Sequence, residues 1–360
     1  MRVGIASGQA SAMVEDATQV AQLLTDAGVE VELEEGLAAA VGSTGTPLRK
    51  MSVDVLAVVG SDHTLLNTLL RLGKRSSPVL PVASRGQPGF LFDVSAASFE
   101  EAVEDLVARR WSIERRARLH ITMDGAESPL ILNEIAIFPR TSAILIGYSL
   151  HLEGEPFWKD MSDGLIISTP TGSTAYAMSV GGPVVVSPAP VMTVIAVNSA
   201  NPARRPLIVP DSMTLEVKDI SSRVTVDVIF DGQVRRPLRG KSIQVTRSTN
   251  DALFVKFPEE RVAALHGKLL KKIEVFESVA QDLPPSAKLV LKVLEYGEQL
   301  SQREIIEETK LPARTVRHAL SILISEGLVM KKLSLRDSRQ GLFRLTNPRK
   351  KDEPAPDTRK

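Results

Sequence analysis

The spacing of apolar residues changes along the chain, and each change predicts a different kind of structure. Short apolar runs at residues 2–6, 29–33 and 54–59 predict strands, and apolar residues at helical spacing lie between or after them. Gly28 stands where the first helix, expected from about residue 11 to 27, should end. Strands that alternate with helices are typical of an open α/β domain, which we assign to residues 1–110.

From residue 111 to 258 the apolar period shortens towards two, as in HITMDG, LEVKDI, RVTVDVIF and SIQVTRS. Asp-Gly pairs at 124–125 and 231–232 punctuate this region. We therefore expect a β-rich second domain at 111–258. Residues 259–280 carry apolar positions along one helical face, so we expect a connecting helix or an oligomer contact there.

A separate helical module is predicted at residues 281–346, after Pro284-Pro285. Its second helix should begin at the capping-box spacing of 301–304, its third should begin at Pro312, and two strands should follow. This pattern resembles a winged helix-turn-helix, which would bind double-stranded DNA or another protein. The candidate DNA contacts are Arg314, Thr315, Arg317, Lys332, Arg336 and Arg339. Residues 347–360 contain one alanine and, apart from proline, no larger apolar residue, which predicts a disordered tail.

Composition narrows the class of protein. With 43% hydrophobic residues in 360, each domain can bury a core. No apolar run approaches the roughly eighteen residues of a membrane span, and Glu15 and Asp16 argue against a signal peptide, so we expect a cytoplasmic protein with no membrane partner. Without cysteine and with five scattered histidines, no structural metal site is expected.

Charge is distributed unevenly. Residues 281–360 hold 16 lysines and arginines against 11 acidic residues, a net charge of +5 in a chain whose total is +1. A basic module on a slightly acidic body favours a polyanionic partner for that module.

The segment 163–183, DGLIISTPTGSTAYAMSVGGP, carries the most chemistry. An apolar run at 165–167 predicts a strand, Pro170 and Gly172 predict a tight loop, and a helix is expected to begin near Thr174. A helix start offers free backbone N–H groups, so Thr171, Gly172, Ser173 and Thr174 would receive an anionic group. Read alone, the same residues also make ordinary turns and caps.

This segment resembles the signature of the NAD kinases, which phosphorylate the adenosine ribose 2′-hydroxyl of NAD. Further motifs agree in order: GSDHT at 60–64 against the family's GGDGT, GFL at 89–91, LNEI at 132–135, RPLIVPDS at 205–212 and DGQ at 231–233. The resemblance covers residues 1–258, although PVASRG at 81–86 departs from the family's GIN pattern.

The resemblance implies an NAD kinase-like fold with the active site between its α/β and β-rich domains. Asp62 would be the general base, beside Gly60, Ser61, His63 and Thr64 in the phosphate loop, where ligands of open α/β sheets bind. Asn133 and Glu134 would hold the adenosine part, and Asp163 would accept a hydrogen bond from a ribose or backbone donor. Tyr176 would pack on a ligand ring or in the core, and Asp231 would bind or only shape a hairpin turn. The implied small molecules are NAD, ATP or another phosphate donor, and Mg²⁺, in a homodimer or homotetramer.

Two functions remain open at this point. Ser61 and His63 replace family glycines, and if those positions need positive φ, each side chain costs about 1–2 kcal/mol. A side chain there would also stand where backbone approaches the donor phosphates, which puts catalysis in question. The first function is an NAD kinase with an added winged helix. The second is a catalytically degenerate, dinucleotide-sensing transcriptional regulator that binds DNA.

Overall fold

The computed structural model describes residues 1–75, 77–86, 89–258, 283–296, 300–326, 328–333 and 341–345. They fall into two compact units, Met1–Glu259 and Glu260–Lys360. The expected connecting helix at 259–280 and the tail at 347–360 lie outside the described residues. Among the helices of these ranges, none has the length and apolar character that a bilayer crossing requires.

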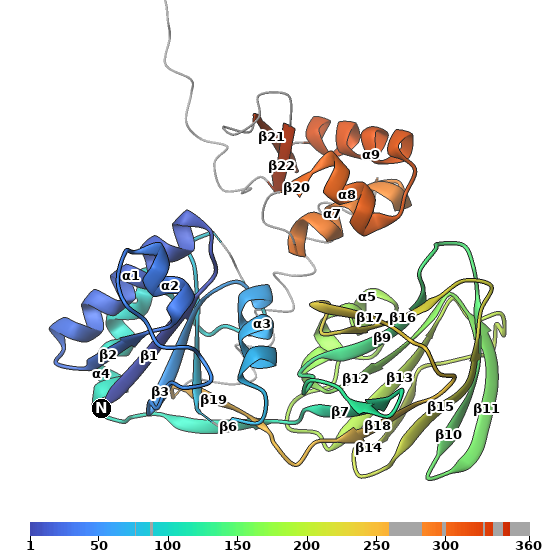
Figure 1. Ribbon diagram of the computed structural model, residues 1–360, viewed down its shortest axis with the longest axis horizontal. Helices are drawn as coiled ribbons and strands as arrows, with labels where there is room; N and C mark the ends of the chain where they lie inside the picture. The colour runs from blue at the N-terminus through green and yellow to red at the C-terminus, as the bar shows by residue number, and fades with distance from the viewer. Residues whose placement is uncertain are drawn as a thin grey trace, which may run out of the picture. The chain divides into compact units, whose positions relative to one another are not determined.

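The first part of unit 1 is a seven-stranded, mostly parallel sheet in the order β2-β1-β3-β4-β19-β6, with β5 paired to β4 (Figure 1). Its strands are β1 (Arg2–Ser7), β2 (Glu30–Leu33), β3 (Val55–Gly60), β4 (Val79–Ala83), β5 (Val94–Ser95), β6 (Ser112–Arg116) and β19 (Ala252–Lys256). Its helices are α1 (Ser11–Asp26), α2 (Glu35–Ala40), α3 (Asp62–Leu72), the 3₁₀ turn η1 (Ala96–Ser98) and α4 (Phe99–Val107).

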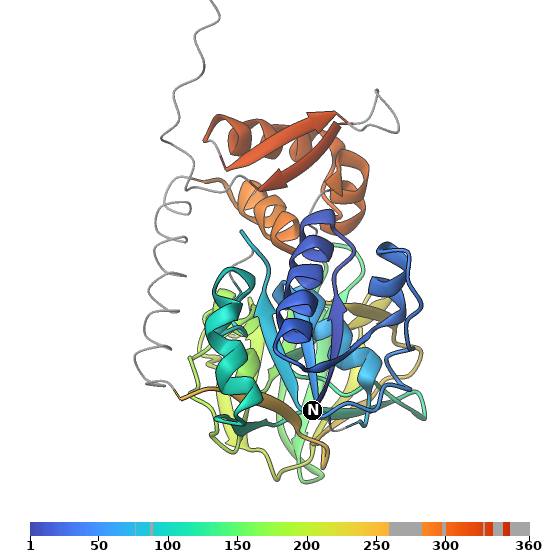
Figure 2. The same cartoon turned by 90° about the vertical axis from the view of Figure 1, so that its left-hand side faces the viewer.

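Helices cover both faces of this sheet because the β3 run VLAVVG is apolar at every position. Val55, Ala57 and Val59 face a core shared with α1 and α4. Leu56 and Val58 face the opposite core, which contains four of the five leucines of α3. Figure 2 shows α1 and α4 side by side on their face.

The second part of unit 1 is a sandwich of two six-stranded sheets, ordered β11-β10-β15-β18-β7-β8 and β14-β13-β12-β9-β16-β17. One apolar core contains inward-facing residues of both sheets. The strands are β7 (Leu119–Met123), β8 (Ala126–Glu127), β9 (Glu134–Pro139), β10 (Ile146–Leu152), β11 (Glu155–Ser162), β12 (Gly164–Ser168), β13 (Val191–Val197), β14 (Leu207–Pro210), β15 (Leu215–Ser221), β16 (Val226–Phe230), β17 (Val234–Pro237) and β18 (Ile243–Arg247). After β12 come the 3₁₀ turn η2 (Thr171–Thr174) and the short helix α5 (Tyr176–Ser179).

The chain passes between the α/β sheet and the sandwich twice. It leaves the α/β sheet between β6 and β7 and returns between β18 and β19. Within the α/β sheet, β6 and β19 pair with each other. The two crossings therefore lie beside each other, which ties the two parts of unit 1 together.

The described residues of unit 2 form three helices and a small antiparallel sheet in the order β20-β22-β21. Its elements are α7 (Pro285–Tyr296), β20 (Leu300–Ser301), α8 (Gln302–Thr309), α9 (Ala313–Ser325), β21 (Val329–Leu333) and β22 (Gly341–Leu345). The helices and sheet share one apolar core that includes Val290, Leu320 and Phe343. The predicted capping box is present, because the Ser301 hydroxyl accepts from the Glu304 N–H and the Glu304 carboxylate accepts from the Ser301 N–H.

Candidate functional site

Asp231 joins two motifs that are 98 residues apart in sequence. It follows β16, with φ 49°, and its buried carboxylate faces the start of β9. Oδ1 accepts from the N–H groups of Asn133 (2.7 Å) and Glu134 (3.2 Å), and Oδ2 accepts from that of Leu132 (2.9 Å). The DGQ motif does turn the chain into β17, but the side chain of Asp231 also holds the LNEI motif in place.

The ionisation of Asp231 reflects its burial. Loss of water raises the pKa of Asp231 to about 7, although the three N–H bonds and the nearby Arg118 charge act in the opposite direction. The carboxyl group that orders the Asn133–Glu134 segment therefore changes charge near neutral pH.

The turn after β12 packs against the same segment. The Thr169 N–H donates to the Asn133 carbonyl (2.8 Å), and the Thr169 hydroxyl donates to the Leu132 carbonyl (2.6 Å). A Cβ on Gly172 would lie 2.2 Å from the Asn133 carbonyl oxygen, so only glycine permits this approach. The fold thus brings Thr171, Gly172, Ser173 and Thr174 together with Asn133 and Glu134, and all six are buried.

The sequence predicted free backbone N–H groups in this turn, but two of them have hydrogen-bond partners within it. The Gly172 N–H donates to the Thr169 hydroxyl (3.1 Å) and the Ser173 N–H to the Pro170 carbonyl (3.2 Å). A 3₁₀ turn at 171–174 precedes the short helix α5, and its internal bonds occupy donors that a regular helix start would leave open.

Asn133 carries an acceptor suited to a ligand. Its side-chain oxygen is buried and meets no hydrogen-bond donor among the described residues. A buried polar atom without a partner costs free energy, so such an atom beside a candidate site indicates a group that a ligand satisfies.

In the loop between β3 and α3, Ser61 and Asp62 have different roles. Ser61 caps α3, because its hydroxyl accepts from the Thr64 N–H and the Thr64 hydroxyl accepts from the Ser61 N–H, each at 3.4 Å. These capping bonds join Ser61 and Thr64 and do not involve Asp62. Its carboxylate accepts from the N–H groups of Phe90 (2.9 Å) and Leu91 (3.0 Å), which ties it to the GFL segment.

The condition for strain in this loop, a positive φ at Ser61 or His63, is not met. Ser61 has φ −105°, an ordinary extended value, and His63 lies within α3. The position that needs glycine is Gly60, with φ 156° and a virtual Cβ 2.6 Å from the Thr64 hydroxyl. His63 is exposed, yet the loss of water on its protein side lowers its pKa, which favours the neutral ring over a cationic phosphate contact.

A buried carboxylate holds the segment that departs from the GIN pattern. Asp16 of α1 accepts from the Ser84 hydroxyl, from the Arg85 N–H (2.7 Å) and from the Arg85 guanidinium. Burial opposes ionisation, but these bonds hold the pKa of Asp16 below its usual value. Sequence reasoning missed this residue, although it shares the helical spacing of the apolar positions Met13, Ala17 and Val20.

Of two further predicted site residues, Asp163 lies apart from the junction formed by 132–134, 168–174 and 231, and Tyr176 follows its turn directly. Asp163 precedes β12 and accepts from the Asn198 amide (2.9 Å), one five-residue strand away from the turn, or roughly 17 Å. Tyr176 stacks on Phe138 with ring centroids 5.8 Å apart, which agrees with its core alternative.

The predicted DNA-contact residues divide by position. Arg314 and Arg317 are exposed on α9, Thr315 is half-buried, and the opposite helix face is buried at Val316, Ala319, Leu320 and Leu323. Lys332 belongs to β21, but the position of its side chain is not described. Arg336 and Arg339 lie outside the described residues.

The comparisons with known proteins concern mainly unit 1. Residues 132–257 match the family described as the ATP-NAD kinase C-terminal domain. The chain is 32% identical over 219 residues to an NAD kinase of Methanopyrus kandleri, covering 61% of this chain and 78% of that protein. It is 28% identical over 276 residues to an NAD kinase of Methanothermobacter thermautotrophicus, covering 75% of this chain and 97% of that protein.

Two solved structures are similar to this fold. An NAD kinase from Archaeoglobus fulgidus in complex with ATP matches with a TM-score of 0.62 and 28% identity, covering 75% of this chain and 99% of that one. A yeast NADH kinase complexed with NADH matches with a TM-score of 0.66 and 21% identity, covering 79% of this chain and 89% of that one. The second likeness concerns the fold alone.

Proposed function

Because the chain belongs to the NAD kinase family, we propose that it transfers the terminal phosphate of ATP to the 2′-hydroxyl of the adenosine ribose of NAD and gives NADP. The observation that carries this proposal is the junction at which Asp231 and Gly172 hold the Asn133–Glu134 segment. Three motifs that are distant in sequence converge there on buried polar groups. The ATP complex of the Archaeoglobus relative supports ATP as the donor.

We assign proton acceptance to Asp62. In the reaction the ribose oxygen forms a bond to the γ-phosphorus, the bond from that phosphorus to the leaving ADP oxygen breaks, and the hydroxyl proton passes to the carboxylate. The Phe90 and Leu91 N–H groups fix the orientation of this carboxylate. An ionised carboxylate has about four lone-pair sites, so it can take a proton while these bonds persist.

We assign adenosine binding to Asn133 and Glu134. The buried side-chain oxygen of Asn133 is an acceptor for a hydroxyl or amino hydrogen of the nucleoside. The packed turn at Thr171–Thr174 closes the site behind it, since Gly172 leaves no space against the Asn133 backbone. Asp163 would then act at a distance from this junction, on another part of the dinucleotide, whereas Tyr176 would act beside the turn.

Mg²⁺ fits this site as an ion carried by the nucleotide. The described residues contain no group of three or more acidic, histidine or cysteine side chains arranged for a metal. Mg²⁺ in phosphoryl-transfer sites is usually held by one or two carboxylates and the substrate phosphates, where it neutralises developing charge. We propose that the substrate phosphates are the main ligands of this ion, since Asp62 is assigned to proton acceptance and Glu134 to adenosine binding.

Asn133→Ala tests the binding site without relying on turnover. The variant should weaken NAD affinity by about tenfold in calorimetry, because the ligand loses one buried hydrogen bond. Its thermal stability should change little, since the lost oxygen accepts no bond from the described protein. Asn67→Ala, at an exposed position of α3, is the control. Equal NAD affinity in all three proteins would remove Asn133 from the site.

We further propose that residues 281–346 form a winged helix-turn-helix that binds double-stranded DNA in a homodimer. The favouring observation is the two-faced α9, which exposes Arg314 and Arg317 and buries the opposite face against α7 and α8. The antiparallel pair β21–β22 follows it, as a wing would. The relatives reported above are named NAD kinases, so they do not support the alternative function, a transcriptional regulator without kinase activity.

A further inference from the structure

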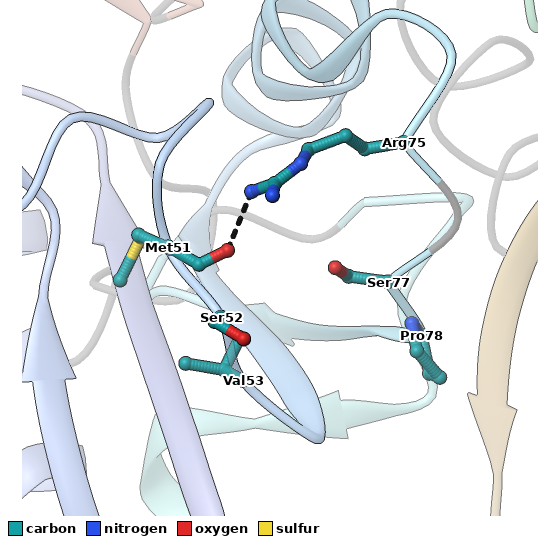
Figure 3. A pocket seen from close by; sticks show the side chains of 6 residues that line it. All are labelled: Met51, Ser52, Val53, Arg75, Ser77 and Pro78. Atoms are coloured by element: carbon teal, nitrogen blue, oxygen red, sulfur yellow. Dashed lines mark hydrogen bonds between the residues drawn. The ribbon is translucent and has the colours of Figure 1, made fainter.

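A basic hollow lies at the end of α3 that is opposite to Asp62. Figure 3 shows its first part, of about 330 Å³, lined by Met51, Ser52, Val53, Arg75, Ser77 and Pro78. These residues precede β3 and β4 or follow α3, so the hollow lies at the amino ends of strands whose carboxyl ends carry the candidate catalytic loop. A second part, of about 510 Å³, adjoins it at Arg75 and is lined also by Arg49 and Lys74.

The cations of this hollow are held mainly by carbonyl groups. Arg75 Nη1 donates to the Met51 carbonyl (2.5 Å), and Arg49 Nε donates to the Arg71 carbonyl (2.9 Å). Lys74 approaches Glu127 at 3.5 Å, but no acidic residue is among those that line either part, and no described carboxylate pairs with Arg49 or Arg75. Their positive charge is therefore left uncompensated, while one wall offers the hydroxyls of Ser52 and Ser77.

The donor set matches one class of ligand. A guanidinium presents five N–H donors in a rigid plane, and the described contacts of Arg75 use one of them. Planar arginine donors with neighbouring hydroxyls suit phosphate oxygens, which accept charge-assisted bonds from several directions. We propose that this hollow is a second, non-catalytic site for a phosphate chain, either of a short inorganic polyphosphate or of a nucleotide diphosphate.

The site adjoins a buried clamp. Arg118, with 1% of its surface exposed, donates to the carbonyls of Gly73 (2.9 Å), Asn250 (2.7 Å) and Asp251 (3.4 Å). Gly73 also lines the hollow, and Arg118 and Asn250–Asp251 lie on the two crossings between the α/β sheet and the sandwich. A bound anion would thus order the segment that this clamp fastens, and it should raise the thermal unfolding temperature.

Calorimetric titration with tripolyphosphate at about 50 mM salt tests the proposal. The Arg49→Met, Arg75→Met double variant should weaken tripolyphosphate binding by at least about tenfold, and Arg75→Lys should weaken it less. Arg223→Met, at an exposed loop position, is the control and should bind as the wild type does. The KM for ATP should stay within about twofold in every variant, because the catalytic loop is unchanged.

The outcomes are distinct. Equal tripolyphosphate affinity in the double variant and the wild type, an equal loss in the Arg223 control, or no binding to the wild type would overturn the site. A parallel titration of ADP into the same proteins identifies the source: a loss of affinity in the double variant that is confined to tripolyphosphate indicates an inorganic chain, and a loss that extends to ADP indicates a nucleotide. The readout is binding, so the result does not depend on whether the protein phosphorylates NAD.

Discussion

Replacing Gly172 by alanine should damage the nucleotide site through backbone contact alone. The new Cβ would lie 2.2, 2.4 and 2.7 Å from the carbonyl oxygen, carbonyl carbon and Cα of Asn133. Each separation is well below a van der Waals contact, and none involves a flexible side chain, so the turn at 171–174 must move by about 1 Å. Overpacking of this kind costs about 1–3 kcal/mol of stability.

The same displacement should impair catalysis more than stability. It disturbs the bonds from Thr169 to the Leu132 and Asn133 carbonyls, which place the adenosine-binding pair. Because a misplacement of about 1 Å can cost on the order of 10²-fold in rate, kcat/KM for NAD should fall by about that factor. Steady-state kinetics and thermal unfolding measure the two effects. Gly147→Ala is the control, since its Cβ would meet only side-chain atoms, the Ser221 hydroxyl at 3.0 Å and Met161 Cγ at 3.9 Å. Wild-type kinetics in Gly172→Ala would refute the close packing on which the site depends.

Three further predictions concern separate features. Asp62→Asn should lower turnover by at least about 10²-fold with NAD affinity within a few-fold, and unchanged turnover would assign Asp62 to anchoring of the 90–91 backbone alone. The pKa of Asp231 rises to about 7 on folding, so between about pH 4 and 7 the folded protein holds a proton that the unfolded chain has released. The contribution of this proton to the free energy of unfolding is therefore present at low pH and is lost as pH rises through 7. Between pH 5 and 8, urea unfolding should show a loss of unfolding free energy of about 2–3 kcal/mol relative to Asp231→Asn, and equal pH dependence in both proteins would contradict the raised pKa. The Arg314, Arg317 double variant, changed to alanine, should lose sequence preference among random duplexes in gel shifts at about 50 mM salt, whereas wild-type behaviour would favour a protein-interaction module.

Local patterns predicted the elements well where one face or both faces of an element are buried. The apolar run of β3, the leucine spacing of α3 and the capping box at Ser301 are each decided by residues within a few positions of one another. The chain's order of motifs also pointed to Asn133, Glu134 and Gly172, which the fold brings together.

The long-range partners of polar groups were not predictable in the same way. The Asp231 carboxylate meets N–H groups 97 to 99 residues away, and Asp16 meets Ser84 and Arg85, so neither bond leaves a local signal beyond an aspartate in a turn or on an apolar helix face. Strain at Ser61, which would require a positive φ there, does not arise, and the reason is related. The capping bond from the Thr64 N–H sets an extended φ at Ser61, and it leaves the demand for glycine one residue earlier, at Gly60.

Formation of NADP by the purified protein is the most direct test of the account. The protein is incubated with NAD, ATP and Mg²⁺, and the product is read by a dehydrogenase that accepts only the 2′-phosphorylated dinucleotide. The account predicts steady NADP formation that depends on both substrates and falls by at least about 10²-fold in Asp62→Asn. A wild-type rate no higher than that of Asp62→Asn, in protein that binds NAD in calorimetry, would contradict it.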